Sequence, residues 1–446
     1  MRSAFVILIA KILNFGTKII GKNSGNLIGK IAKKLSPNII EYFKIECPVI
    51  AVTATNGKTT TNNCISYMIN KNGKKVISNY EGNNMETGII TTLLKSSRLN
   101  GKINADYITL EVDESYVPVI FKKMRLDTLV VLDFFRDQLD RNGEVETLIL
   151  KINDFLKDYQ GNLILNRDDP NVARLGRANQ NNNNVYYFSV DKYAYATETE
   201  KEAGEGKFCP FDKTRLNYEY YQYSHIGKYN CPICGYGREP VFIQISDVNV
   251  KNGSFNANSK LNQDTIINYS TLANSIYTIY NFAATLAIAK LYGFEAKQAL
   301  ATFKLDNGRC EEMTILGNRT LINLAKNPTG ANVSLRILNE DEEEKDLLFV
   351  LNDNAADGHD VSWIWDINFD LKKVNRIVTS GQRAYDIAIR IKTSGFDAEK
   401  IVAYTDLDKA VNELFLNKNK KYVIANYTAL QPTREALKKF ARNNKK

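Results

Sequence analysis

Residues 48–73, PVIAVTATNGKTTTNNCISYMINKNG, carry the pattern from which we expect an α/β fold. Its apolar opening predicts a buried strand, TNGKTT a tight turn, and the rest a helix that ends near Gly73. At such a turn the backbone N–H groups and the dipole of the helix attract anions. The candidate nucleotide-binding residues are Thr55, Asn56, Gly57, Lys58, Thr59 and Thr60.

This turn does not satisfy the strict phosphate-loop pattern G-x-x-x-x-G-K-[ST], because Val52 occupies the position of its first glycine. A turn that binds no phosphate is therefore the alternative. The strand before it, the helix after it and G-K-T-T between them favour a nucleotide site. Lys58 would hold the terminal phosphates and Thr59 would ligate Mg²⁺.

Further apolar runs follow in DYITLEVDES (106–115), DTLVVLDFF (127–135) and GNLILNRDDP (161–170). Strands that alternate with helices predict an α/β fold with a doubly wound sheet, whose ligands lie at the carboxyl ends of the strands. Glu111, Asp113 and Glu114 follow such a strand. Because hard divalent cations need oxygen ligands, Glu111 is our second candidate for Mg²⁺, although acidic residues at strand ends more often face solvent.

Composition limits the function classes. The 446 residues exceed one ordinary core and suggest two or three domains, and the 44% hydrophobic content excludes wholesale disorder. A net charge of +9 suits phosphate-rich ligands or an anionic membrane but identifies neither. Six cysteines in a chain of this length do not make a disulfide scaffold, so we expect a reducing, cytoplasmic location.

The N-terminal residues contain the apolar run AFVILIA (4–10), which Lys11 and Lys18 follow. We find no cleavage site, and no run of about 20 apolar residues that could span a bilayer. A packed amphipathic helix over residues 1–20 is the simple interpretation. A helix that lies on the inner face of the membrane is the alternative.

Changes in amino-acid composition suggest the domain boundaries. We expect an N-terminal segment (1–45), a central α/β domain (46–305) with a Cys-rich insert (205–240), and a C-terminal Rossmann-like α/β domain (306–446). The strands of the last domain are LINLA, DLLFVLN, NRIVTSG and KYVIA. The acidic run EDEEEKD (340–346) is interpreted as a solvated loop.

The insert places C-P-F-D at Cys209–Asp212 and C-P-I-C at Cys231–Cys234, with eighteen residues between the two. This spacing is typical of a zinc ribbon, in which Asp212 replaces the fourth cysteine. His225 is a competing donor for that position. A relic ribbon that has lost its metal is the alternative.

At this point the residues resemble a family. TNGKTT, LEVDES, FFRDQLDRNGEVE, LNRDDP and YNFAATLAIA occur in the order found in the ATP-binding domain of Mur ligases. The later motifs GRCEEM, AKNPTGAN, DNAADGHDVSWIWD, GQRAYDIAIRIKTSGF and NYTAL are similar to the MurT branch of these ligases. Together the motifs extend from about Cys47 to Leu430.

The resemblance implies that the chain uses ATP and Mg²⁺ to amidate the α-carboxyl group of D-glutamate in the stem peptide of lipid II, through an acyl phosphate. Ammonia would come from a GatD-type glutaminase partner. No cysteine here lies in a nucleophile elbow, which is consistent with hydrolysis of glutamine elsewhere. The proposed partners do not include nucleic acid.

The resemblance also assigns individual residues. Asn166 and Asn281 match positions that line the nucleotide site, and Arg309 and Lys326 would face nucleotide or substrate. Gln138 replaces a histidine of amino-acid-adding relatives. Two departures bear on the ATP site: Ala54 stands where a glycine is usual, and Asp133 replaces an asparagine.

In the MurT family an aspartate from the segment DNAADGHD completes the catalytic Cys–His–Asp arrangement of the glutaminase. A carboxylate in this role fixes the tautomer of the histidine and stabilises its protonated form. We choose Asp357, with Asp353 and Asp360 as rivals. Packing of Trp363 and Trp365 with solvent-facing aspartates is the simpler alternative.

Two other functions compete with this hypothesis. An amino-acid-adding Mur or folylpolyglutamate-type ligase would need no partner, and the DGHDVSWIWD segment argues against it. A zinc-ribbon ATPase that binds nucleic acid would need basic residues around the ribbon. The stretch from Cys209 to Cys234 has only three, alongside two acidic residues.

Overall fold

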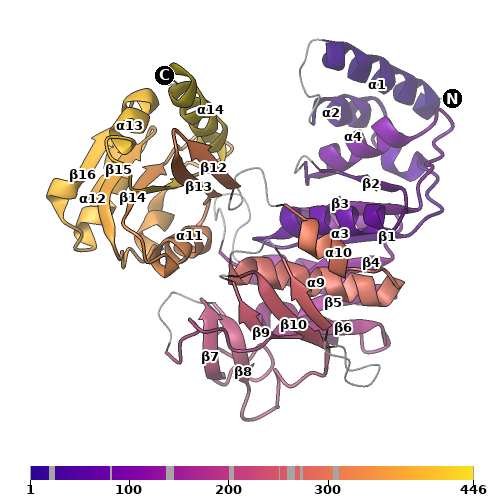
Figure 1. Ribbon diagram of the computed structural model, residues 1–446. Helices are drawn as coiled ribbons and strands as arrows, with labels where there is room; N and C mark the ends of the chain where they lie inside the picture. The colour runs from indigo at the N-terminus through magenta and orange to yellow at the C-terminus, as the bar shows by residue number, and fades with distance from the viewer. Residues whose placement is uncertain are drawn as a thin grey trace. The chain divides into compact units, whose positions relative to one another are not determined.

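The computed structural model describes residues 2–19, 26–80, 83–136, 145–199, 205–250, 252–258, 267–271, 275–304 and 311–444. The chain forms two compact units, and we describe each by itself. The first comprises most of Met1–Phe303, and the second is essentially Lys304–Lys446. Each unit contains a sheet with helices packed against it (Figure 1), so the predicted α/β class is confirmed.

The first unit is built on a nine-stranded sheet with the order β11-β10-β9-β6-β5-β4-β1-β3-β2. The seven strands β9, β6, β5, β4, β1, β3 and β2 of this sheet pair in parallel. β10 and β11 extend the sheet beyond β9 in antiparallel orientation. Their bounds are β1 (Val49–Thr53), β2 (Val76–Ser78), β3 (Tyr107–Glu111), β4 (Thr128–Val131), β5 (Asn162–Asn166), β6 (Val185–Val190), β9 (Val241–Asn249), β10 (Ser254–Asn258) and β11 (Ile267–Ser270). The order of the strands reverses at β1, and such a switch point opens a crevice at the carboxyl ends.

Helices cover both faces of this sheet. Residues that alternate along β1, such as Val49 and Ala51, enter a core with the N-terminal helices, because successive side chains of a strand point to opposite faces. That face carries α1 (Arg2–Ile19), α2 (Leu27–Leu35), α4 (Glu86–Ser96), α5 (Val117–Phe121), α7 (Val145–Leu156) and α8 (Pro170–Ala173). On the opposite face α3 (Lys58–Lys71) packs against α9 (Ile276–Tyr292) and α10 (Lys297–Thr302).

The Cys-rich insert forms the two-stranded antiparallel sheet β7 (Asn217–Tyr223) and β8 (Ile226–Asn230) in the lower part of Figure 1. The described part of the first unit also contains the short 3₁₀ turns η1 (Ile39–Tyr42), η2 (Glu114–Tyr116) and η3 (Arg174–Arg177). The paired strands of the insert and the antiparallel strands β10 and β11 were not among our expected elements. β7 follows a long segment after β6, whereas β10 follows β9 after a short turn.

The second unit contains six strands in the order β12-β13-β17-β14-β15-β16, parallel except for β12. Leu347 and Phe349 of β14 pack with α11 and α12, and Leu348 and Val350 pack with α13 and α14. The elements are β12 (Glu311–Ile315), β13 (Asn318–Leu324), α11 (Pro328–Glu340), β14 (Lys345–Val350), η4 (Ser362–Asp366), β15 (Val374–Ser380), α12 (Ala384–Thr393), η5 (Ala398–Lys400), β16 (Ile401–Tyr404), α13 (Leu407–Leu414), β17 (Lys420–Ala425) and α14 (Tyr427–Asn443).

The acidic run 340–346 is not the solvated loop that we expected, because its last two residues begin β14 and are buried. Nζ of Lys345 donates to the carbonyl oxygen of Leu338 at 3.0 Å. Asp346 forms an ion pair with Lys421 of β17, with 2.6 Å between Oδ2 and Nζ. Partners on neighbouring elements therefore allow these charges to enter the sheet.

Replacing Lys421 with methionine should lower the free energy of unfolding by about 3–5 kcal/mol, because the carboxylate of Asp346 would remain buried without its cation. Both tryptophans of the chain lie in η4, so tryptophan fluorescence in urea reports the unfolding of this unit. The matched control is Lys439→Met. Its pair with Asp408 is half-exposed, so the cost should be about 0–1 kcal/mol. Equal costs for the two variants would contradict the interpretation.

Candidate functional site

The turn between β1 and α3 requires a glycine. Gly57 precedes α3 in the left-handed conformation, with φ of 82°. A Cβ at this position would lie 2.4 Å from Oδ1 of Asn281, a buried residue of α9. Only a residue without a side chain fits here. Two predicted nucleotide residues that are far apart in sequence are thus brought together.

Lys58, the first residue of α3, is turned back on the loop. Its Nζ donates to the carbonyl oxygens of Ala54 at 2.6 Å and Thr55 at 3.4 Å, and lies 3.4 Å from Oε2 of Glu114. The side chains of Lys58 and Glu114 are both buried. A bound triphosphate would compete with these carbonyl and carboxylate oxygens for the ammonium group.

Thr59 and Thr60 occupy the first turn of α3 and are buried. The first N–H groups of a helix have no acceptor within the helix, and together with the dipole they favour an anion. The start of α3, at Lys58 to Thr60, is therefore the part of this segment that favours an anion. Asn56 is held from the side by Asp133, whose Oδ1 accepts from the backbone N–H of Asn56 at 2.8 Å.

Glu111 ends β3 directly beside Val52 of β1. The side chain of Asn79 fixes its backbone, accepting from the N–H and donating to the carbonyl oxygen, both at 2.8 Å. Oε1 accepts from Asn84 at 3.0 Å, whereas Oε2 is buried and has no hydrogen-bond partner among the described residues. A buried carboxylate oxygen without a partner is unfavourable, and a hard cation would satisfy it. Glu111 therefore fits the predicted Mg²⁺ site.

The end of β4 forms the other border of the loop. Asn166 of β5 donates to the carbonyl oxygen of Leu132 at 2.9 Å and accepts from the N–H of Asp168 at 3.0 Å. The amide of Asn166 thus connects the segment after β4 to the segment after β5. Burial raises the pKa of Asp133 well above its usual range, and the hydrogen bond from Asn56 opposes this effect.

The other residues predicted for nucleotide or substrate belong to the second unit or are not described. Arg309 lies outside the described residues, as does Gln138. Lys326 is half-buried between β13 and α11, in the second unit. Its neighbour Asn327 caps α11 by accepting from the N–H of Gly330 at 2.8 Å.

The three candidate aspartates of the second unit differ in exposure. Asp357 is buried and accepts hydrogen bonds from the backbone N–H of Thr428, at 2.8 Å, and from its hydroxyl. Asp353 pairs with Arg383, with 2.8 Å between Oδ2 and Nη2. Asp360 is exposed and accepts from the N–H of Ser362 at 2.8 Å.

The cysteine cluster assembles as the spacing predicts. One ligand atom from each of Cys209, Asp212, Cys231 and Cys234 lies within 4.8 Å of the others. The Sγ atoms of Cys209 and Cys234 are 3.6 Å apart, and Sγ of Cys231 is 3.2 Å from Oδ2 of Asp212. A tetrahedral site with Zn–S bonds of about 2.3 Å has edges of about 3.8 Å, so these separations suit zinc.

The two halves of the cluster share one backbone design. Lys213 and Gly235, which follow the second ligand of each half, are left-handed and donate to the carbonyl oxygens of Cys209 and Cys231, at 3.0 and 3.1 Å. His225 does not join the cluster. It is buried, with Nε2 placed 3.4 Å from Oδ1 of Asp169, so it is not the fourth ligand.

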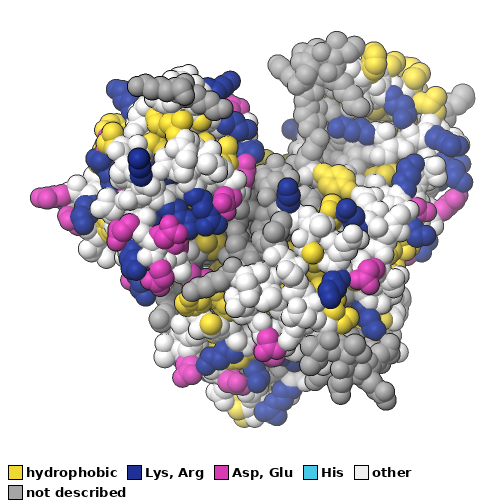
Figure 2. Space-filling view, in the orientation of Figure 1, with side chains coloured by type: hydrophobic (Ala, Val, Ile, Leu, Met, Phe, Trp, Pro, Cys, Tyr) yellow, Lys and Arg dark blue, Asp and Glu magenta, His cyan; other side chains and the backbone are white. Residues whose placement is uncertain are grey.

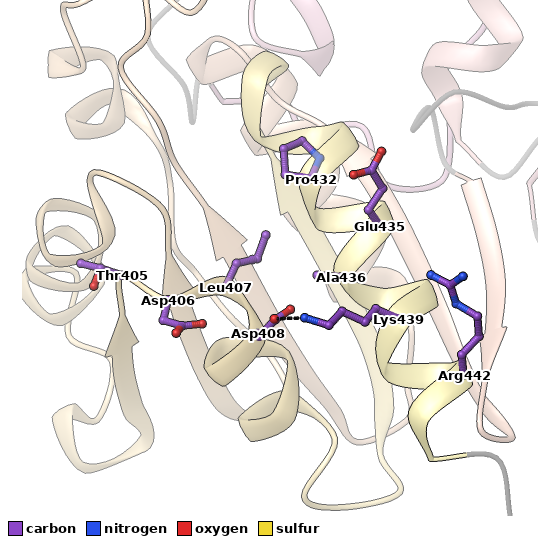
Figure 3. Close-up of a pocket in the computed structure, with 9 residues that line it drawn as sticks. All are labelled: Thr405, Asp406, Leu407, Asp408, Pro432, Glu435, Ala436, Lys439 and Arg442. Atoms are coloured by element: carbon purple, nitrogen blue, oxygen red, sulfur yellow. Dashed lines mark hydrogen bonds and ion pairs between the residues drawn. The ribbon is translucent and has the colours of Figure 1, made fainter. Parts of the chain in front are cut away.

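Sequence reasoning missed Asn79 and Asn84 as supports of Glu111. Asn79 directly follows β2, at the carboxyl edge of the sheet, and this position was the available signal. A cavity of about 700 Å³ between α13 and α14 contains none of the predicted residues. Figure 3 shows Asp408 and Lys439 pointing toward each other there, from opposite helices.

Comparisons with known proteins agree with this geometry. The model of the Mur ligase middle domain matches residues 52–232, and the model of the MurT ligase C-terminal family matches residues 324–430. The lipid II isoglutaminyl synthase (glutamine-hydrolyzing) subunit MurT of Staphylococcus aureus (strain COL) is 32% identical over 98% of each chain. The corresponding subunit of Streptococcus pneumoniae (strain ATCC BAA-255 / R6) is 29% identical, over 98% of this chain and 97% of that protein.

Solved structures support the fold. A pseudomurein peptide ligase type C from Methanothermus fervidus superimposes with a TM-score of 0.69 at 21% identity, covering 90% of this chain and 81% of the other. MurF ligase from Thermotoga maritima, solved in complex with ADP, gives 0.65 at 16% identity, covering 94% and 85%. At these identities the likeness concerns the fold alone.

Asp133→Ala should weaken nucleotide binding about fivefold, because the loop loses a hydrogen bond worth about 1 kcal/mol.

Asp133→Asn keeps an acceptor for Asn56 but cannot ionise. An acid with a raised pKa stays neutral to higher pH and becomes negative above that pKa, where it repels phosphate. The Kd of a fluorescent ATP analogue should therefore rise with pH in the wild type relative to Asp133→Asn. A ratio that does not change with pH would contradict this.

Proposed function

The chain belongs to the MurT family of lipid II isoglutaminyl synthase subunits, and we propose that it amidates the α-carboxyl group of D-glutamate in lipid II to give D-isoglutamine, a step of peptidoglycan biosynthesis. ATP would activate the carboxyl group, and a GatD-type glutaminase partner would supply the ammonia. The observation that carries the proposal is the similarity of the second unit to the MurT C-terminal family. This similarity lies outside the middle domain that the chain shares with other Mur ligases.

The chemistry explains the need for a nucleotide. A carboxylate is a poor electrophile, and transfer of the terminal phosphoryl group of ATP to its oxygen creates an acyl phosphate with a good leaving group. The nitrogen of ammonia then forms the C–N bond as phosphate leaves and a proton is released. Such a reaction needs positioned phosphates and neutralised charge more than a protein nucleophile.

Different residues around the phosphate loop would bind the phosphates and Mg²⁺. Thr59 and the free Oε2 of Glu111 would hold Mg²⁺, which neutralises charge on the phosphates when it is bound. Lys58 would exchange the carbonyl oxygen of Ala54 for the terminal phosphate. Asn281 would keep the space beside Gly57 too small for a side chain, so that the turn before α3 is made by a glycine. Lys326 remains our candidate for contact with the substrate.

Asp357 is the aspartate that we propose for the glutaminase. A carboxylate that orients a histidine must itself be held in place, and Thr428 holds both oxygens of Asp357. The rivals are placed less well for this role. Arg383 already neutralises Asp353, and Asp360 is exposed at the start of a short helical turn.

The cluster of three thiols and one carboxylate would hold a structural zinc ion. Burial raises the pKa of the Cys209 thiol, and desolvation raises that of Cys234 to about 12. Without metal these thiols therefore keep their protons at neutral pH, and zinc must displace them. We expect the ion to stabilise the insert and to take no part in the reaction.

The function can be tested with purified chain, a GatD-type partner, Mg-ATP and lipid II, with either glutamine or ammonium chloride as the nitrogen source. Mass spectrometry should show a decrease of about one dalton, as OH is replaced by NH₂. Glu111→Gln should reduce both reactions about a hundredfold or more. Asp357→Asn should reduce only the glutamine-driven reaction, by a similar factor, because free ammonia bypasses the partner.

Asp353→Asn and Asp360→Asn are the matched controls for Asp357→Asn. If one of them selectively loses the glutamine-driven reaction, that residue takes the proposed role instead. If the wild type with both nitrogen sources leaves the mass of lipid II unchanged, amidation is not the function. Consumption of an amino acid without a partner would favour the ligase alternative.

Zinc can be measured by elemental analysis of the purified chain, where we expect about one equivalent per chain. Cys231→Ser and Asp212→Ala should lose most of it, and Asp212→Cys should retain it against a stronger chelator, because thiolate is the softer ligand. Cys47→Ser, which removes a buried cysteine outside the cluster, is the control. Unchanged zinc content in Cys231→Ser would refute the site.

A further inference from the structure

Helix α1 (Arg2–Ile19) is apolar on two opposite faces. Its inner face buries Val6, Ile7 and Ala10 in the core of the first unit, against α2 and α4. Its outer face exposes four large apolar side chains: Phe5 (63%), Leu8 (42%), Ile12 (63%) and Phe15 (68%). We call these four residues the outer stripe.

The spacing of the outer stripe matches the turn of the helix. Its members follow one another at intervals of three, four and three residues, which places them along one side of an α-helix. Figure 2 shows hydrophobic side chains along the edge of α1 at the upper right. Exposed large apolar residues are common singly, but a contiguous stripe marks a surface for another molecule.

The charge around the stripe identifies the kind of partner. Residues 1–40 carry no acidic side chain, and the first one is Glu41. They carry seven of the basic residues that give the chain its charge of +9: Arg2, Lys11, Lys18, Lys22, Lys30, Lys33 and Lys34. An acidic bilayer surface attracts such a segment, whereas a neutral apolar partner would have no need of it.

Helix α2 (Leu27–Leu35) contributes to the same surface chemistry. Leu27, Lys30 and Lys34 are exposed and lie on one side of the helix, since they are three and four residues apart. Lys33 instead pairs with the buried Glu86 at 2.5 Å, which attaches α2 to α4. Apolar side chains flanked by exposed lysines are typical of helices that lie in a membrane interface.

Among the described helices, none has both the length and the hydropathy needed to cross a bilayer. We propose that the outer stripe of α1, with Lys11 of α1 and Lys30 and Lys34 of α2, binds the surface of an anionic lipid bilayer. The apolar side chains enter the interface, and the first unit stays outside it because the inner face of α1 is committed to the core. This contact would hold the chain beside a lipid-linked substrate, a consequence that rests on the proposed function.

The test is co-sedimentation of the full chain with vesicles of phosphatidylcholine alone, or mixed with an equal amount of phosphatidylglycerol. The wild type should bind the anionic vesicles, and high salt should weaken the binding. The triple variant Phe5→Gln/Ile12→Gln/Phe15→Gln should bind at least about tenfold more weakly. Lys30→Gln/Lys34→Gln should bind more weakly and respond less to salt.

The matched control replaces three exposed apolar residues elsewhere: Ile233→Gln/Ile389→Gln/Leu416→Gln. It should bind vesicles like the wild type, and circular dichroism should show that all variants are folded. Equal binding of the wild type to neutral and anionic vesicles, or unchanged binding of the stripe variant, would overturn the proposal. So would a dimer in the absence of lipid that the stripe variant abolishes, because a second copy would then cover the stripe.

Amidation of detergent-solubilised lipid II separates this proposal from the proposed function. The stripe variant should retain that activity, since none of its three positions belongs to the nucleotide site. Vesicle binding by a wild type that cannot amidate would refute the function alone. Amidation without vesicle binding would refute the membrane contact alone.

Discussion

The close approach of Asn281 to Gly57 determines the local backbone of the nucleotide site. Oδ1 of Asn281 occupies the space of a side chain, and the backbone of Gly57 is left-handed, so both observations require a glycine at this turn. This turn fixes where α3 begins relative to β1. Lys58 and Thr59 then start a helix at the carboxyl edge of the sheet, beside Glu111.

The second requirement of the site is polar support on both sides of the loop. Asn79 and Asn84 hold Glu111 from the β2 side, and Asp133 holds the backbone of Asn56 from the β4 side. These bonds leave one oxygen of Glu111 without a protein partner within the described residues. The arrangement thus positions a negative oxygen before any cation arrives, which lowers the cost of organising the site.

Most of the fold and of the nucleotide site could be predicted where neighbouring residues in the sequence form a recognisable pattern. Hydrophobic runs located the central strands, and the turn residues located the phosphate loop. We did not predict β10, although Asn252 and Gly253 lie between it and β9 and this dipeptide is a local signal for a hairpin. Pairing between distant segments could not be predicted, and Lys345 and Asp346 were assigned to a solvated loop because their partners lie on other elements. The fourth ligand of the cluster could be predicted because its spacing is local.

The similar turns at Lys213 and Gly235 bear on which ligand residues such a ribbon can contain. Each loop is shaped by a left-handed residue and a backbone hydrogen bond, and neither depends on the chemistry of the ligand side chain. A ribbon can therefore keep this scaffold with an aspartate at one of the four ligand positions, as at Asp212. A census of ribbon proteins that requires four cysteines would overlook members of this kind.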